Sequence, residues 1–287
     1  MKIGIIGLGL IGGSMAKTLK KRSEHTILGM DMSQKVMQKA KLLEVTHGPL
    51  TEDGIPECDM LIIATWPQGA VEYVRSHAAV IKKGATVLDV CGVKRAICEP
   101  LWDIAKEHDF LFVGGHPMAG VEHSGLEYAT DTMFDRASMI LTPPRGSDIQ
   151  TLARLKKFFL DMGFGQVVIT TPEEHDQVIA YTSQLPHVVA SAYVRSPLML
   201  GHHGFSAGSF RDMSRVASVD ENLWTQLFQQ NREPLLNELN GLIDRLTEYR
   251  DALRDGQEDT LRGLLREGRE RKTQTEQRGK NNEEYGR

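Results

Sequence analysis

The sequence has few cysteines, no long apolar run and no surplus of basic residues, and each lack excludes a class of protein. Its three cysteines, Cys58, Cys91 and Cys98, are odd in number and lack close CxxC spacing, which argues against a disulfide framework or a cysteine zinc site. No segment approaches the roughly 20 apolar residues of a membrane-spanning helix. The formal net charge of −4 points to no nucleic-acid or anionic-membrane partner. We expect a cytoplasmic protein with reduced cysteines.

What is present is the composition of a folded globular protein. Of its 287 residues, 40% are hydrophobic and 25% are charged, and this length is enough for one large or two ordinary domains. The short apolar run at residues 3–7 breaks into glycines, so we expect no signal peptide. His202 and His203 lie in a glycine-rich segment without a plausible ligand set, and we assign no metal site.

Strand-like and helix-like segments alternate through the first two-thirds of the chain. The strand-like runs cover residues 2–6, 26–30, 60–65, 86–90, 110–113, 139–142 and 166–170. Helical patterns cover residues 11–21, 33–43 and 148–161. Alternation of this kind predicts an α/β fold with an N-terminal, Rossmann-type doubly wound parallel sheet.

The character of the sequence changes at Thr171-Pro172. From residue 173 to about 266 there is no convincing strand, only segments with helical spacing, and residues 268–287 are almost devoid of apolar side chains. We therefore predict a dinucleotide-binding domain over residues 1–170, an all-helical C-terminal domain over 171–267 and a charged, flexible tail over 268–287.

A glycine-rich GxGxxG run follows the first predicted strand and opens the first predicted helix. The chemistry of pyrophosphate binding requires a tight turn, a close backbone approach and close helix–strand packing at the three glycines, and the helix start then presents N–H groups to the phosphates. We assign the whole run to the cofactor site: Gly7, Leu8, Gly9, Leu10, Ile11 and Gly12.

Two further residues complete the predicted cofactor site. Asp31 ends the second strand, 19 residues after Gly12, where a carboxylate accepts hydrogen bonds from ribose hydroxyls and repels a 2′-phosphate. This position favours NAD over NADP, although a helix-capping aspartate would look the same in sequence. Thr65, at the end of the third predicted strand, is also assigned to this site.

His116 follows the predicted strand at residues 110–113, within the segment Gly-Gly-His-Pro-Met-Ala-Gly at 114–120. Ligands of open parallel sheets bind beyond the carboxyl ends of the strands, so this histidine is placed at the crevice. Oxidation of an alcohol needs a group that takes the hydroxyl proton, and a histidine titrates near neutral pH. We predict that His116 is catalytic.

Three segments together resemble the prephenate/arogenate dehydrogenase family of tyrosine biosynthesis. Gly-Gly-His-Pro-Met-Ala-Gly at 114–120 looks like that family's catalytic motif. Ser-Gln-Leu-Pro-His at 183–187 and Phe-Arg-Asp-Met-Ser-Arg at 210–215 resemble two later motifs, and order and spacing match from residue 1 to about 265. The resemblance implies a homodimer formed through the helical domain and a small-molecule substrate.

The resemblance also implies roles for individual residues. His116 would draw the proton from the ring hydroxyl as hydride passes to NAD, and carbon dioxide would then leave. His187 would contact the substrate side chain and Arg215 would anchor a carboxylate, whereas Glu122, Asp212 and Trp224 would shape the pocket. Structural roles remain open: a core hydrogen bond for His187, an Asp212–Arg215 ion pair, and core packing for Trp224.

The chain departs from the family pattern at two positions. Gly92 stands where many members have serine, so the hydroxyl that could bridge the catalytic histidine and the substrate is absent. Water or another donor would then have to orient His116. Gln184 replaces a family histidine, and we expect both Gly92 and Gln184 to lie near the substrate.

The leading hypothesis is NAD-dependent oxidative decarboxylation of prephenate to 4-hydroxyphenylpyruvate. The same chemistry on arogenate, giving tyrosine, is the nearest alternative, and no single residue separates the two. A dehydrogenase or reductase of another small carboxylate and an NAD-sensing regulator also remain open. A proton acceptor at His116 and a carboxylate anchor at Arg215 argue against a sensor, which needs neither.

Overall fold

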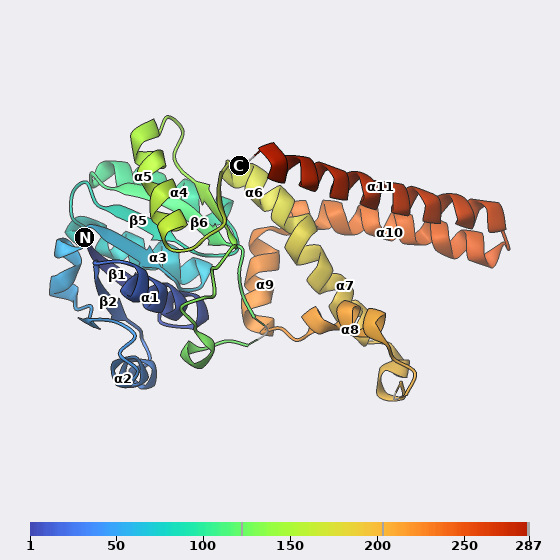
Figure 1. The fold of residues 1–287 in the computed structure, drawn as a ribbon, viewed down its shortest axis with the longest axis horizontal. Helices are drawn as coiled ribbons and strands as arrows, with labels where there is room; N and C mark the ends of the chain where they lie inside the picture. The colour runs from blue at the N-terminus through green and yellow to red at the C-terminus, as the bar shows by residue number, and fades with distance from the viewer. Residues whose placement is uncertain (122, 203, 286–287) are drawn as a thin grey trace. The chain divides into compact units, whose positions relative to one another are not determined.

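The computed structural model describes residues 1–121, 123–202 and 204–285 (Figure 1). Glu122, one of the predicted site residues, and His203 therefore lie outside the described residues. The chain forms two compact units, Met1–Leu235 and Leu236–Arg287, and the first contains the sheet. None of the described helices is long and apolar enough to cross a membrane.

The first unit is built on an eight-stranded sheet with the order β3-β2-β1-β4-β5-β6-β7-β8. The strands are β1 (Lys2–Ile6), β2 (Thr26–Met30), β3 (Gly48–Pro49), β4 (Met60–Ile63), β5 (Thr86–Asp89), β6 (Leu111–Pro117), β7 (Ser138–Thr142) and β8 (Gln166–Ile169). The order of β1 to β6 is that of a doubly wound dinucleotide-binding fold. The predicted α/β fold with a Rossmann-type sheet is confirmed.

Helices cover both faces of this sheet (Figure 1). One apolar core joins the sheet to α1 (Leu10–Arg22), α2 (Gln34–Leu42) and α5 (Ile149–Asp161). The other joins the opposite face to α3 (Pro67–His77) and α4 (Arg95–Glu107). Burial on both faces explains why β1, β4 and β5 are nearly continuous apolar runs in the sequence.

The sheet differs from the prediction at β6 and β7. Their pairing is antiparallel, with Gly114 opposite Thr142 and His116 opposite Ile140, so the sheet is not wholly parallel. This pairing extends β6 to Pro117, beyond the predicted end at Val113. His116 therefore lies within a strand rather than in a loop after it, and backbone hydrogen bonds of the ladder hold its position.

After β8 the described residues form no further strand, as predicted. The helices are α6 (Pro172–Ile179), α7 (Leu185–Val194), α8 (Gly208–Ser214), α9 (Glu221–Gln230), α10 (Arg232–Arg254) and α11 (Glu258–Tyr285). A π-helical turn, Ala180–Gln184, connects α6 to α7. It precedes Pro186, which has no N–H to donate to the preceding turn. Wide turns of this kind are frequent at functional sites.

The second unit contains most of α10 and all of α11, with Gly256 at a positive φ of 65° between them. Residues 268–285, predicted to be part of a flexible tail, continue α11 as a helix. Ion pairs one turn apart, Glu267–Arg271 and Lys272–Glu276, favour this helical form. The scarcity of apolar side chains, on which the tail was predicted, therefore does not prevent helix formation here.

Candidate active site

The β1–α1 turn has the geometry that close approach of a phosphate group requires. Gly7 has a φ of +88°, and a Cβ at Gly12 would lie 1.9 Å from the Gly7 carbonyl oxygen. A Cβ at Gly9, in contrast, would meet no protein atom within 4 Å. Gly7 thus permits the tight turn, and Gly12 permits α1 to pack closely against that turn. Gly9 leaves open space beside the backbone, where a phosphate group could approach.

The start of α1 fits a pyrophosphate group. Gly9 caps this helix without any side-chain hydrogen bond, and its first turn contains no acidic residue. Backbone N–H groups at such a helix start attract anions. Thr65 lies beside the turn, since its Cγ2 atom is 3.2 Å from the position that a Cβ on Gly7 would take.

Asp31 is held at the rim of the same turn. Its Oδ2 accepts a hydrogen bond of 2.9 Å from the backbone N–H of Leu8, and its Oδ1 accepts one of 2.8 Å from Ser33. Each carboxylate oxygen can accept more than one bond, so the group keeps capacity for ribose hydroxyls. A carboxylate fixed at this rim would repel the 2′-phosphate of a dinucleotide whose ribose it contacted.

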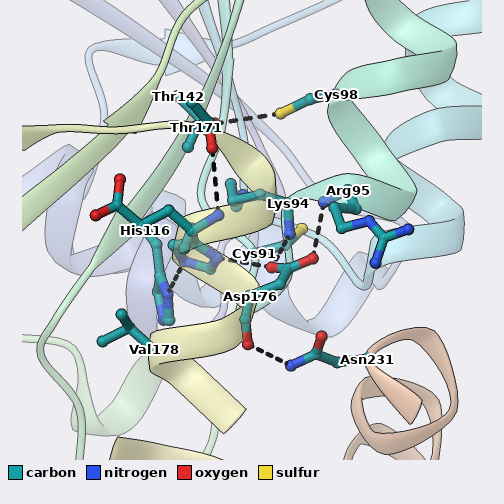
Figure 2. Close-up of polar contacts among 12 residues, drawn as sticks. Cys91, Lys94, Arg95, Cys98, His116, Thr142, Thr171, Asp176, Val178 and Asn231 are labelled. Atoms are coloured by element: carbon teal, nitrogen blue, oxygen red, sulfur yellow. Dashed lines mark hydrogen bonds and ion pairs between the residues drawn. The ribbon is translucent and has the colours of Figure 1, made fainter. Parts of the chain in front are cut away.

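His116 lies at the carboxyl end of β6 with its ring directed toward α6 (Figure 2). Its Nδ1 is 2.9 Å from Nε2 of His175, a residue of α6, and Nδ1 of His175 is 2.7 Å from Oδ1 of Asp176. His175 and Asp176 are buried, whereas His116 is only partly so. The Nδ1 side of the His116 ring thus contacts buried residues of α6.

A fully buried lysine lies behind this pair of histidines. Lys94 forms an ion pair with Asp89, at the end of β5, and donates a hydrogen bond of 2.7 Å to the carbonyl of Gly115. Burial acts to lower the pKa of Lys94, but the Asp89 carboxylate and nearby thiols outweigh it and raise that pKa. The charged lysine joins the ends of β5 and β6 next to the histidines.

The surroundings of His116 favour a neutral imidazole. Burial of the ring holds its pKa well below the ordinary 6.5, a proton on the adjacent His175 would lower it further, and the charge of Lys94 acts in the same direction. A histidine that is neutral at physiological pH can accept a proton from a reacting hydroxyl. The arrangement can therefore supply a general base.

A second cluster lies where α7 and α9 meet the 3-10 turn Arg215–Ala217, which follows α8. The ring of His187, in α7, packs against Trp224 with centroids 3.8 Å apart, and its Nδ1 donates a hydrogen bond of 2.7 Å to the carbonyl of Val216. Burial lowers the pKa of His187, and the charge of Arg215 adds to this effect against the opposing bond to Val216. Arg215 thus lies close enough to His187 to affect its titration.

Helix α9 connects the two clusters through residues on one of its faces. Trp224 contacts His187, Leu227 lies over Gly92, and Asn231 at the helix end donates hydrogen bonds of 2.8 Å to the carbonyl of Asp176 and to Oε1 of Gln184. This i, i+3, i+7 spacing places all three on one stripe.

Comparison with known proteins agrees with this geometry. The family model of the prephenate dehydrogenase nucleotide-binding domain matches residues 15–169, and that of the prephenate dehydrogenase dimerization domain matches residues 171–267. The chain belongs to the prephenate dehydrogenase family.

Individual members of the family are similar over most of their length. Prephenate dehydrogenase of Bacillus subtilis is 31% identical over 259 residues, which are 86% of this chain and 68% of that protein. The structure of Aquifex aeolicus prephenate dehydrogenase in complex with hydroxyphenyl propionate and NAD+ has a TM-score of 0.83 at 28% identity, covering 94% of this chain and 97% of that one. Synechocystis arogenate dehydrogenase has a TM-score of 0.81 at 28% identity, covering 96% and 100%.

The structure shows which residues contact Gly92 and Gln184, the two positions at which the chain departs from the family pattern. The side chain of Leu227 occupies the space above Gly92, 3.4 Å from where a Cβ would lie. Gln184 is buried, and its amide is used within the protein: it accepts from Asn231 and donates a bond of 3.4 Å to the carbonyl of Leu227. In this family member, Gln184 connects helices.

The structure adds residues that the sequence reasoning missed. His175, Asp176 and Lys94 contact one another or His116, yet the sequence reasoning gave none of them a role. The sequence signal was a His-Asp pair directly after the acidic first turn of α6, which was interpreted only as a helix start. Of the remaining predicted residues, Asp212 is exposed on α8.

Proposed function

We propose that this protein catalyses the NAD-dependent oxidative decarboxylation of prephenate to 4-hydroxyphenylpyruvate. The observation that carries the proposal is His116, an imidazole of lowered pKa fixed at the carboxyl end of β6 in a sheet whose first turn fits a dinucleotide. Membership of the prephenate dehydrogenase family supports the same reaction.

In the proposed reaction, bound NAD accepts a hydride from C4 of the substrate ring. Nε2 of His116 accepts the proton of the C4 hydroxyl as the hydride leaves, so that a carbonyl forms at C4. The bond between the ring and its carboxylate then breaks, and its electron pair completes the aromatic ring. His116 returns the proton to the phenolate oxygen. The products are 4-hydroxyphenylpyruvate, carbon dioxide and NADH, with no net release of a proton.

Helices α7 to α9 supply the groups for the rest of the substrate. We place the ring carboxylate against Arg215 and the side chain against His187, because His187 is hydrogen-bonded to the carbonyl of Val216, the residue after Arg215. A charge-assisted hydrogen bond contributes about 1.5–3 kcal/mol. Trp224 holds the His187 ring from one side. We further assign Asp212 and Gly92 to the border of the substrate site.

Arogenate is the second candidate substrate. The similarity to Synechocystis arogenate dehydrogenase favours it, at an identity equal to that of the Aquifex aeolicus prephenate dehydrogenase. The two substrates differ only by a keto or an amino group on the side chain, so we expect identical chemistry at His116.

The deciding experiment measures NADH formation by the purified protein with prephenate and with arogenate, each with NAD and with NADP. We expect turnover of prephenate with NAD. Turnover of arogenate alone would replace the proposed substrate, and turnover of neither by a sample that binds NAD would overturn the proposed function.

We also propose a homodimer formed through a helical domain over residues 171–267, with the dinucleotide-binding domain over residues 1–170. The matched dimerization-domain model supports this assembly. Large apolar side chains are also exposed in this region, on helical segments at Leu198, Leu200, Ile243, Leu246 and Leu253 and in the turn before α8 at Phe205. Such side chains are typically covered by a partner. A cytoplasmic location is proposed from the three free thiols.

A further inference from the structure

Behind His116, two hydrogen bonds connect the ring to a carboxylate. His116 Nδ1 lies 2.9 Å from His175 Nε2, and His175 Nδ1 lies 2.7 Å from Asp176 Oδ1. Figure 2 shows His116 and Asp176 within this network, on either side of the α6 backbone. Three ring nitrogens take part in these two bonds: Nδ1 of His116 and both nitrogens of His175. Because each of them faces a single partner, the position of the proton in one bond determines its position in the other.

The direction of the bonds follows from Asp176. Its two carboxylate oxygens accept backbone N–H bonds of 2.8 Å from Lys94 and 3.0 Å from Arg95, at the start of α4 (Figure 2). Lys94 provides no side-chain cap for that helix, so Asp176 serves as its cap from α6. With both oxygens acting as acceptors, the bond between Asp176 and His175 has Nδ1 of His175 as its donor.

The tautomer of His116 then follows. A neutral imidazole that donates from Nδ1 has its lone pair at Nε2, so His175 accepts and His116 must donate from its own Nδ1. This leaves the lone pair of His116 at Nε2. Burial lowers the pKa of His175, with Lys94 acting in the same direction and Asp176 opposing both, which agrees with a neutral His175.

We propose that His175 and Asp176 are positioning residues that hold His116 in the tautomer protonated at Nδ1, with Nε2 free to accept the substrate proton. The inference rests on the proposed function for the role of His116 as base. When Nε2 gains the proton, the imidazolium keeps its Nδ1–H bond to His175, and the carboxylate of Asp176 stabilises the positive charge through that ring.

This arrangement also orients His116, a task that the missing serine hydroxyl at residue 92 could otherwise perform. The sequence led us to expect a water or another donor to orient His116 in place of the family serine. The partner in the structure is an acceptor, His175, which contacts His116 from α6 rather than from the loop that contains Gly92.

The direct test is the tautomer of His116 in the protein without substrate. Nitrogen-15 NMR of histidine-labelled protein distinguishes Nδ1–H from Nε2–H, and a His116→Gln variant assigns the signals. We expect Nδ1–H in the native protein and a shift toward Nε2–H in His175→Phe. In the same variant, kcat should fall about 10- to 100-fold while KM changes by less than about threefold.

Two further variants separate positioning from packing. His175→Gln retains an oxygen that can accept from Nδ1 of His116, so we expect more Nδ1–H and a higher kcat than in His175→Phe. Asn231→Ser removes the bond to the Asp176 carbonyl but leaves all three side chains of the series. It should leave the His116 tautomer unchanged even if it lowers the melting temperature.

The proposal is overturned if native His116 is protonated at Nε2, or if His175→Phe and His175→Gln both keep the native tautomer. The NMR measurement needs no substrate, so its result is independent of the proposed function. The expected tautomer in a protein that turns over neither prephenate nor arogenate would support the positioning role and overturn the proposed reaction.

Discussion

Leu227 of α9 lies over Gly92, with its Cδ2 atom 3.4 Å from the position of a Cβ on that glycine. This distance is close to ordinary van der Waals contact, so a small side chain fits after a slight shift. The contact connects the loop after β5 with the helix that also contains Trp224 and Asn231. Substitutions at residue 92 can therefore test whether the absent serine hydroxyl affects catalysis, because a small side chain there should not disrupt the fold.

For Gly92→Ser we expect kcat to change by less than about threefold, because His175 already provides the hydrogen bond of His116 Nδ1. Gly92→Ala is the matched control, since it adds the same Cβ against Leu227 without the hydroxyl. Steady-state kinetics with prephenate compares the two. A gain in kcat above about tenfold for serine over alanine would mean that His116 is poorly oriented in the native protein.

Arg215→Ala should raise KM for prephenate about 10- to 100-fold, which corresponds to the loss of one charge-assisted hydrogen bond. NAD binding should not change, because the dinucleotide turn belongs to the β1–α1 connection. Arg211→Ala removes an exposed arginine of α8, four residues before Arg215, and is the control. Equal KM values for the two variants would assign Arg215 a structural role.

Asp31→Ser should raise the ratio of kcat/KM for NADP to that for NAD by about tenfold or more, because it removes a negative charge from the ribose site. Asp31→Asn separates charge from geometry, since its side-chain oxygen can still accept from the N–H of Leu8. We expect it to relax the preference as well. An unchanged cofactor ratio in both variants would exclude the ribose contact.

Much of the cofactor site could be predicted from local sequence, because a strand, three spaced glycines and a helix start are all encoded within a dozen residues. His116 was found for a similar reason. The end of its strand was not predicted, since β6 continues from Val113 to Pro117 only through pairing with β7, which comes more than 20 residues later. His175 and Asp176 were missed because their partners, His116 and the start of α4, lie far away in the sequence.

The pH dependence of kcat/KM should show an acidic limb with a midpoint below 6.5. Burial lowers the pKa of His116 and the positive charge of Lys94 lowers it further, while neutral His175 faces the ring and Asp89 and Asp176 lie behind Lys94 and His175. Protonation of His116 removes the base, so activity is lost as the pH falls through that lowered pKa and stays level above it. A midpoint above about 7 would show that His116 is not held neutral.

The measurement that tests the role of His116 most directly is the turnover of prephenate by His116→Asn beside the native protein, together with the dissociation constant for NAD of each. We expect kcat to fall by about 100-fold or more, because the proton acceptor is lost. NAD should bind both proteins equally well. A variant that binds NAD and turns over prephenate at the native rate would contradict the assignment of His116 as the catalytic base.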